Sequence, residues 1–293
     1  MAGSRASQPT VVRTRCELDG VLALARGAER RVGLVPTMGA LHAGHAALLR
    51  EARADADLVV TSIFVNPLQF APGEDLHRYP RTWDADLETC AREGVDVVLA
   101  PDVADIYPDG PDGGVSVDPG PLGAVLEGAA RPGHFRGVLT VVAALVGLVR
   151  PATAWFGAKD YQQLVLVRRM VRQLSQRVDV RGVPIVREPD GLALSSRNGY
   201  LDADQRRDAT ALWRALQAGS GRGSAGPAEV ESAARAVLDG VSGLWPDYVS
   251  VVAPDLAKPP DSGPSRLLVA ARIGETRLID NAAVDLGLSA GGG

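Results

Sequence analysis

Two of the chain's four histidines, His42 and His45, lie three residues apart in the segment PTMGALHAGH. A short apolar run precedes this segment and an alanine- and leucine-rich run follows it, so we expect a strand-to-helix junction, where backbone N–H groups can face an anion. Gly44 would let a phosphate or ribose approach the backbone closely. On one face of the first helical turn, two imidazoles could stabilise a phosphoryl group as its charge grows. The alternative is a pair that only caps an exposed turn.

A second junction, GAKDYQQL, brings a lysine to the expected start of a helix. The helix dipole disfavours a cation there, and a bound anion near Lys159 would explain it. Asp160 is expected at the N-cap, a role compatible with a hydrogen bond to a ribose hydroxyl. Gln163 lies three residues further on and could face the same ligand.

The segment REPDGLALSSRN contains two adjacent hydroxyls and an arginine, Ser195, Ser196 and Arg197. After a glycine-containing loop, these three residues could cradle a phosphate. The alternative is a serine-capped loop that leads into the next helix.

Amide side chains follow the apolar strand expected at 58–66, with Asn66 at its end and Gln69 just beyond it. Uncharged amides suit a small hydroxylated or carboxylated substrate better than a metal ion. We expect His77 and Arg78 to tie this loop down. In the later segment GAARPGHFRGVLTVV, Arg131 and His134 lie among glycines, which indicates either a mobile lid or an ordinary basic loop.

Apolar, β-branched runs alternate with helical patterns through the first two thirds of the chain. The strands are expected at 31–36, 58–66, 95–101, 153–158 and 178–186, and the helices at 44–56, 82–94, 136–149 and 161–176. Such repetition predicts a doubly wound, Rossmann-like parallel sheet, with ligands at the carboxyl ends of its strands. We expect residues 1–186 to form this nucleotide- and substrate-binding domain, after a loose polar start over the first fifteen residues.

The pattern changes after Val186, and a smaller α+β domain is predicted over residues 187–293. Helices are expected at 203–219 and 227–239, with a flexible loop between them. A strand is expected at 247–253, then a hairpin around Gly274 within 266–284. The final residues, 290–293, are expected to be disordered.

Composition excludes several classes of protein. A net charge of −4 argues against a broadly basic nucleic-acid surface. The longest apolar run, 137–149, is too short to span a membrane. The start of the chain lacks a secretory signal, and Cys16 and Cys90 are expected to be free thiols in a reducing cytoplasm.

Six motifs in this order carry a resemblance to a known family: PTMGALHAGH, FVNPLQF, YPRT, PGHFRGVLTVV, KDYQQL and DGLALSSRN. Together they resemble the pantoate–β-alanine ligase family from about residue 10 almost to the C-terminus. The first motif alone would indicate only the wider nucleotidyltransferase superfamily. The resemblance implies that pantoate and ATP form pantoyl adenylate and pyrophosphate, after which β-alanine displaces AMP to give pantothenate. It also implies Mg²⁺ and a homodimer.

The resemblance further implies roles for individual residues. The catalytic residues would be His42, His45, Lys159 and Arg197. The ATP site would comprise Met38, His42, Gly44, His45, Gly157, Lys159, Asp160, Val186, Ser195, Ser196 and Arg197. Pantoate and β-alanine would contact Pro36, Met38, Asn66, Gln69, His134 and Gln163, with Arg131 in a flexible wall.

The sequence departs from the family pattern beside two of these motifs. Ala158 stands where relatives have glutamate, and Ala85 and Thr89 stand where relatives are more polar. Asp84 and Asp86 remain as possible outer-shell contacts to Mg²⁺, which ATP and water would mainly hold. No residue is an evident general base for the amine of β-alanine.

Two other functions are compatible with parts of the pattern. A nucleotidyltransferase that stops after transfer to a phosphorylated substrate would require more cations than a pocket with Gln69 and Gln163 offers. A non-catalytic nucleotide-binding protein is favoured only by Ala158, since every proposed phosphate-contacting residue is present.

Overall fold

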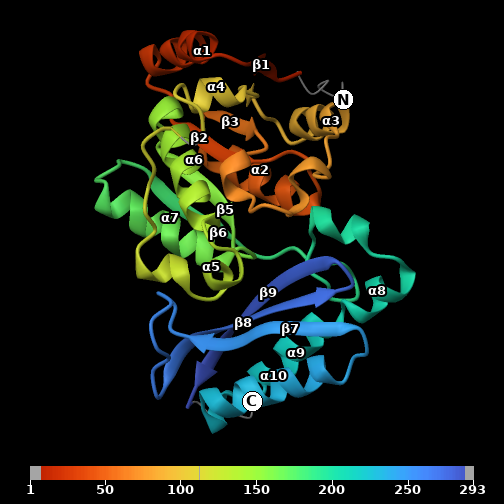
Figure 1. Ribbon diagram of the computed structural model, residues 1–293. Helices are drawn as coiled ribbons and strands as arrows, with labels where there is room; N and C mark the ends of the chain where they lie inside the picture. The colour runs from red at the N-terminus through yellow and green to blue at the C-terminus, as the bar shows by residue number, and fades with distance from the viewer. Residues whose placement is uncertain (1–7, 112, 288–293) are drawn as a thin grey trace, which may run out of the picture. The chain divides into compact units, whose positions relative to one another are not determined.

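The computed structural model describes residues 8–111 and 113–287 (Figure 1). By compactness the chain divides into two units. The first comprises Met1–Ala158 and Leu166–Pro184, and the second comprises Lys159–Val165 and Ile185–Gly293. Each unit is described by itself.

The first unit is built on a six-stranded parallel sheet, which confirms the predicted α/β class. Its strands have the spatial order β1-β4-β3-β2-β5-β6. In chain order, the strands are β1 (Thr10–Val12), β2 (Val32–Thr37), β3 (Leu58–Ile63), β4 (Val97–Leu99), β5 (Thr153–Gly157) and β6 (Asp179–Val183). From β2 the sheet first extends to β3 and β4 on one side, and later to β5 and β6 on the other side. The topological switch point therefore lies between β2 and β5.

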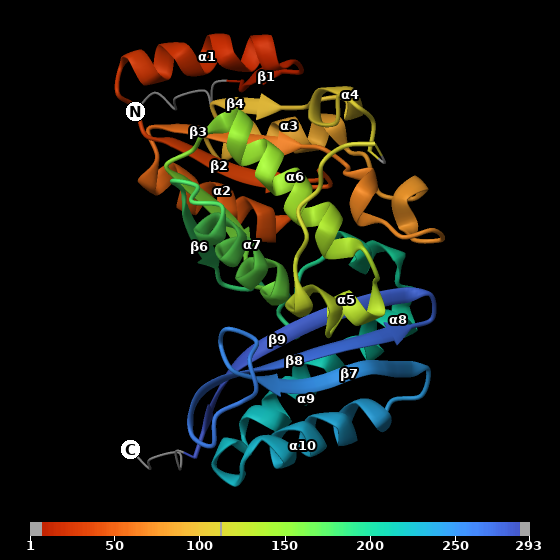
Figure 2. The ribbon, with the colours of Figure 1, turned by 60° about the vertical axis from the view of Figure 1, so that its left-hand side comes forward.

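Helices cover the parallel sheet. The longer ones are α1 (Arg15–Gly27), α2 (Ala43–Asp55), α3 (Trp83–Arg92), α6 (His134–Val149) and α7 (Tyr161–Gln173), and the short ones are α4 (Val103–Ile106) and α5 (Glu127–Ala130). Single 3-10 turns occupy Pro67–Gln69 (η1), Asp75–His77 (η2) and Pro121–Ala124 (η3). Leu49 of α2 and Cys90 of α3 pack with Val35, Val59 and Val98, so these two helices share one face of the sheet. Figure 2 shows α6 crossing the sheet in front of β2 and β3.

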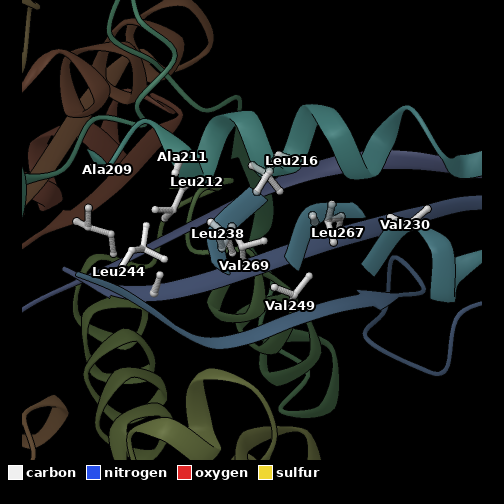
Figure 3. Close-up of a cluster of buried hydrophobic side chains, with 14 of the residues drawn as sticks. Ala209, Ala211, Leu212, Leu216, Val230, Leu238, Leu244, Val249, Leu267 and Val269 are labelled. Atoms are coloured by element: carbon white, nitrogen blue, oxygen red, sulfur yellow. The ribbon is translucent and has the colours of Figure 1, made fainter. Parts of the chain in front are cut away.

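The second unit contains a three-stranded antiparallel sheet, β7-β8-β9, formed by Leu244–Val252, Gly263–Ile273 and Thr276–Leu286. Helices α9 (Ala211–Ser220) and α10 (Pro227–Asp239) pack on it, and Figure 3 shows their leucines and valines meeting those of the sheet. The remaining elements are α8 (Ala203–Asp208) and the 3-10 turns Ser196–Tyr200 (η4) and Gly223–Ala225 (η5). This is the smaller α+β part that the pattern after Val186 predicts.

Two local predictions differ from the structure. The expected polar start contains β1, whose Thr10 pairs with Val97, and helix α1 follows with Thr14 and Glu17 as a capping box. The helix expected at 203–219 is two helices, and the Thr210 hydroxyl between them donates to the Arg207 carbonyl at 2.6 Å. Such a side-chain bond competes with the helical ladder.

Further features of the structure bear on the predictions made for the strand at 58–66, for membrane-spanning segments and for the two cysteines. The strand at 58–66 ends at Ile63, before Pro67 opens η1. No helix in the described ranges is both long and apolar enough to cross a membrane. Cys16 and Cys90 are free thiols, as predicted. The tail 290–293, expected to be disordered, lies outside the described residues.

Candidate active site

The loop that follows β2 is held by a carboxylate from α3. Gly39 and Ala40 both have left-handed backbones, with φ of 82° and 51°. This turn directs two successive N–H groups at Asp86, whose Oδ2 accepts from Ala40 N at 3.0 Å and whose Oδ1 accepts from Leu41 N at 2.8 Å. Asp86 is only 2% exposed and also accepts from the Thr82 hydroxyl. Its contacts therefore shape the loop that carries the two histidines.

His42 and His45 begin α2, at the carboxyl end of β2, as the sequence predicts. His42 is the N-cap, and its Nδ1 accepts from Gly44 N at 3.1 Å. The Nδ1 of His45 accepts from His42 N at 3.2 Å, and the two ring centroids are 4.2 Å apart. A nitrogen that accepts a backbone N–H carries no proton, so both neutral rings are protonated at Nε2. The capping contacts therefore leave each ring as a hydrogen-bond donor through Nε2.

Gln69, expected to bind pantoate, has its side chain held between two other predicted residues. Its Oε1 accepts from Asn66 Nδ2 at 3.2 Å, and its Nε2 donates to Met38 Sδ at 3.0 Å. Asn66 is fully buried, and its Oδ1 accepts from the Tyr107 hydroxyl at 2.8 Å and from Leu68 N at 3.2 Å. With a further bond from Asn66 Nδ2 to a backbone carbonyl in α6, all four amide positions of Asn66 are used within the protein. Asn66 thus orients Gln69.

The backbone of Gln69 is held by a second group of side chains. Arg131 forms a bidentate ion pair with Glu74, at 2.8 and 2.7 Å, and its Nη2 donates to the Gln69 carbonyl at 3.3 Å. Arg131 Nη1 also donates to His134 Nε2 at 3.0 Å, and His134 Nδ1 lies 2.8 Å from the same Gln69 carbonyl. Because arginine only donates and a carbonyl only accepts, His134 must be neutral with its proton on Nδ1.

The pKa values of this group follow from its surroundings. Burial lowers the pKa of His134 to about 4, and the Arg131 guanidinium contributes to this lowering, whereas nearby carboxylates oppose the shift. The pKa of Glu74 is lowered, because its hydrogen bonds and charge contact with Arg131 outweigh the effect of burial. The ion pair with Glu74 and the bond to the Gln69 carbonyl attach Arg131 to this loop.

Gly137 lets helix α6 approach this loop. A Cβ atom at Gly137 would lie 2.2 Å from the Leu68 carbonyl oxygen, far inside van der Waals contact. The Gly137 carbonyl accepts the bond from Asn66 Nδ2 at 3.1 Å. The close approach therefore places the helix backbone within reach of the residue that orients Gln69.

The remaining predicted residues of the first unit lie at the ends of β2 and β5. Pro36, half-buried in β2, pairs in register with Ser62. A Cβ atom at Gly157 would meet no heavy atom of the described residues within 4 Å, and Ala158 N donates to the Val183 carbonyl. β2 and β5 flank the switch point, where ligands of open parallel sheets bind.

The second unit holds the lysine and the serine–arginine segment. Lys159 and Asp160 directly precede α7, and the Lys159 carbonyl accepts from Asn281 Nδ2 at 2.9 Å. Gln163 lies half-buried in the first turn of α7. Ser195 is the N-cap of η4, and its Oγ accepts from Arg197 N at 3.3 Å, with Ser196 between them. The carbonyl of Val186 accepts from Leu194 N, just before this cap.

The two acidic residues named as possible outer-shell contacts to Mg²⁺ differ in exposure. Asp84 is exposed, whereas Asp86 is buried and binds the loop before α2. Within residues 8–111 and 113–287, no group of three or more His, Cys, Asp or Glu side chains could hold a metal ion.

Sequence reasoning did not identify three supporting groups: the Asp86 carboxylate as a backbone acceptor, Glu74 as the partner of Arg131, and Tyr107 as the donor to Asn66. Nothing in their local sequence marks them, since each acts on a residue far along the chain. The one local signal is the acidic first turn of α3, which by itself indicates possible outer-shell contacts to Mg²⁺.

Comparisons with known proteins identify the family of this chain. The family model described as pantoate-beta-alanine ligase matches residues 10–283. A pantothenate synthetase of Nocardia farcinica is 56% identical over 283 residues, covering 97% of this chain and 88% of the relative. The crystal structure of the Thermus thermophilus pantothenate synthetase has a TM-score of 0.85 and 48% identity, covering 93% of this chain and 98% of that one.

A pantoate-beta-alanine ligase of Francisella tularensis, solved in complex with beta-gamma ATP and beta-alanine, is 32% identical, with a TM-score of 0.78. The similarity covers 94% of this chain and 97% of that one. The ordered motifs, the parallel sheet and the matches along nearly the whole chain lead to one conclusion. The chain belongs to the pantoate–β-alanine ligase family.

Proposed function

We propose that this protein joins pantoate to β-alanine in an ATP-dependent reaction, through a pantoyl adenylate. The observation that carries the proposal is the pair His42 and His45 at the switch point of the sheet, in a chain that matches the family over residues 10–283. Because Nδ1 of each ring accepts a backbone N–H, the proton of each neutral ring lies on Nε2. Nε2–H is a hydrogen-bond donor of the kind that phosphate oxygens accept.

The reaction proceeds in two displacements. The pantoate carboxylate attacks the α-phosphorus of ATP, so that a new P–O bond forms and pyrophosphate leaves. The amine of β-alanine then attacks the acyl carbon, the C–N bond forms, AMP leaves and the amine loses a proton. The first step needs alignment and charge stabilisation rather than a protein nucleophile. His42 and His45 supply donors to the phosphates as their negative charge increases.

The pocket residues fit a small hydroxy acid. Gln69 would bind pantoate, and its position is supported by Asn66, Met38 and His134. Pro36 and Met38 would contact the methyl groups of pantoate, and Gly157 leaves room for the nucleotide. Asn66 and His134 would complete this pocket by holding Gln69 in place, since their polar atoms are already paired within the protein.

Residues of the second unit are assigned to ATP and pantoate by the family resemblance. Lys159 would neutralise phosphate charge, and Ser195, Ser196 and Arg197 would donate hydrogen bonds to phosphate oxygens. Asp160 would bind the ribose and Gln163 pantoate. Gly44 and Val186 would contact the nucleotide through their backbones.

The proposed function also involves a metal ion, two domains, a dimer and a cellular location. Mg²⁺ would enter with ATP, held by phosphates and water, where it would neutralise phosphate charge. We propose residues 1–186 and 187–293 as the two domains. The family resemblance supports a homodimer, which light scattering of the purified protein would test, and a cytoplasmic location.

The direct test is an assay with ATP, pantoate and β-alanine. AMP should form only when both acids are present, and Lys159→Ala should lower the rate of adenylate formation by orders of magnitude. A nucleotidyltransferase that stops after transfer would release pyrophosphate with no β-alanine-dependent AMP. Absence of AMP from the complete mixture would refute the ligase.

A further inference from the structure

Two consecutive residues of β9, Asp280 and Asn281, bind two separate segments of the second unit. Both side chains are almost fully buried, at 2% and 1% exposure. Successive residues of a strand point to opposite faces of the sheet. Asp280 lies opposite Val269, which belongs to the apolar cluster under α9 and α10, so Asn281 points to the other face.

On the apolar face, Asp280 binds Arg187. The guanidinium donates to Oδ2 at 2.5 Å and to Oδ1 at 2.9 Å, and it stacks 4.0 Å above the ring of Trp213. Arg187 also donates to the Gly191 carbonyl at 3.0 Å. A Cβ atom at Gly191 would lie 1.9 Å from Trp213 Cδ1, so the loop tip needs glycine here. The ion pair thus fixes both the base and the tip of this loop.

The fixed loop leads directly into the serine–arginine segment. Arg187 forms an antiparallel bridge with Ala193, and the Ala193 carbonyl accepts from Asn198 Nδ2 at 3.1 Å. Ser195, the N-cap of η4, lies between these two contacts. The position of Ser195 and of the turn after it therefore depends on the loop that Arg187 and Asp280 hold.

On the opposite face, Asn281 binds the segment that begins with Lys159. Asn281 Nδ2 donates to the Lys159 carbonyl at 2.9 Å. Two residues further, the Tyr161 hydroxyl donates to the Pro254 carbonyl at 2.9 Å and its ring receives the guanidinium of Arg266 at 4.2 Å. The start of α7 is thus tied to the sheet from its first residues.

We propose that Asp280 and Asn281 are positioning residues for ATP, holding the Ser195–Arg197 segment and Lys159 in one fixed arrangement. The proposal rests on the proposed function, in which these two segments bind phosphates. A largely buried ion pair adds little stability compared with apolar side chains of similar size, so its presence on an apolar face agrees with a geometric role. Phosphate binding needs such fixed donors because each must meet a defined oxygen.

Steady-state kinetics of three variants tests the proposal. In Asp280→Asn and Asn281→Ala, KM for ATP should rise at least tenfold, while KM for β-alanine changes less than twofold. Asp247→Asn is the matched control, because it removes a carboxylate that pairs with Arg272 and Arg277 on the same sheet and should leave every constant unchanged. A merely structural loss would lower the active fraction, and hence the apparent kcat, without changing KM.

Asp280→Asn leaves the Arg187 guanidinium, whose side chain is 18% exposed, beside a neutral amide and should lower the yield of folded protein. The paired variant Arg187→Leu with Asp280→Leu therefore carries the same test with an apolar replacement. It should fold, raise KM for ATP tenfold or more, and speed amide hydrogen exchange at 185–198 in the absence of nucleotide. Wild-type KM and exchange in the folded pair would overturn the positioning role. An inactive wild-type enzyme would instead refute the ligase, and the exchange measurement would still test the arrangement.

Discussion

The backbone N–H of Leu41 donates to Oδ1 of Asp86 at 2.8 Å, although the two residues are 45 positions apart in the chain. Together with the bond from Ala40 N, this contact ties the first turn of α3 to the loop before α2. The loop is short and ends at His42, the N-cap of α2, so the conformation of the loop sets the positions of both imidazole rings. Asp86 is therefore a positioning residue for the histidine pair.

Replacing Asp86 with asparagine should change the conformation of the loop before α2 without unfolding the protein. The amide keeps one acceptor but turns an NH₂ group toward the second backbone donor, which then lies buried without a partner. Such a group costs about 1–3 kcal/mol. We expect adenylate formation to fall by about 10²-fold, because a displacement near 1 Å has that effect. Pyrophosphate release measures it. Glu88→Gln, exposed on the same helix, should behave as wild type, and equal rates in both variants would contradict the role.

His42→Asn separates the capping role of His42 from its phosphate role. Asparagine is a strong N-cap and can accept from Gly44 N as Nδ1 does, but its amide N–H groups do not extend as far as the Nε2–H of the imidazole. Thermal stability should stay near wild type, while the rate of adenylate formation falls by about 10²–10³, the loss typical of one oxyanion donor. His77→Asn, in an exposed turn, is the control. A near-normal rate in His42→Asn would show that the imidazole only caps the helix.

Two glycines of α6 offer a matched comparison. Gly137→Ala should force the helix away from Leu68, disturb the bond to Asn66, and raise KM for pantoate severalfold, with a loss of about 1–3 kcal/mol in the free energy of unfolding. Gly147→Ala places a methyl group where no heavy atom of the described residues lies within 4 Å. It should stabilise the protein by about 0.5–1 kcal/mol and leave KM unchanged. Urea unfolding and initial rates measure both effects, and a neutral Gly137→Ala would refute the close approach.

The neutral state of His134 predicts a dependence of stability on pH. Its pKa is lowered from 6.5 to about 4, first by burial and then by Arg131. Between these values the unfolded chain binds more protons than the folded one, so stability falls as pH drops from 6.5 towards 4 and levels off below. The full shift corresponds to at most about 3 kcal/mol.

His134→Asn isolates this contribution. Asparagine can still donate to the Gln69 carbonyl but does not titrate. Urea midpoints measured from pH 7.5 to 4 should fall more steeply for the wild type than for the variant, since all carboxylates are common to both proteins. Parallel curves would mean that His134 does not account for the slope.

The sequence predicted the alternating strands and helices well, because periodicity, caps and glycine–proline punctuation are local signals. It missed β1, whose three residues are recognisable as a strand only through their pairing with β4. It also predicted one helix across Thr210, where Thr210 N and Leu212 N bond to carbonyls three residues back and the segment divides into two helices. Short elements and breaks of this kind depend on contacts that residue type alone does not specify.

In the candidate active site, too, some features follow from the sequence and others only from the tertiary structure. The sequence by itself determined which residues are available: the paired histidines, the amides after β3, the lysine before α7 and the serine–arginine segment. It also determined the family, through the order of its motifs. Only the tertiary structure decided that Asn66 directs its amide to Gln69, that His134 accepts from Arg131, and that Asp86 and Asp280 each bind a loop. Hydrogen-bond partners separated by tens of residues are chosen by sheet register and helix packing, which bring together groups that no local pattern connects.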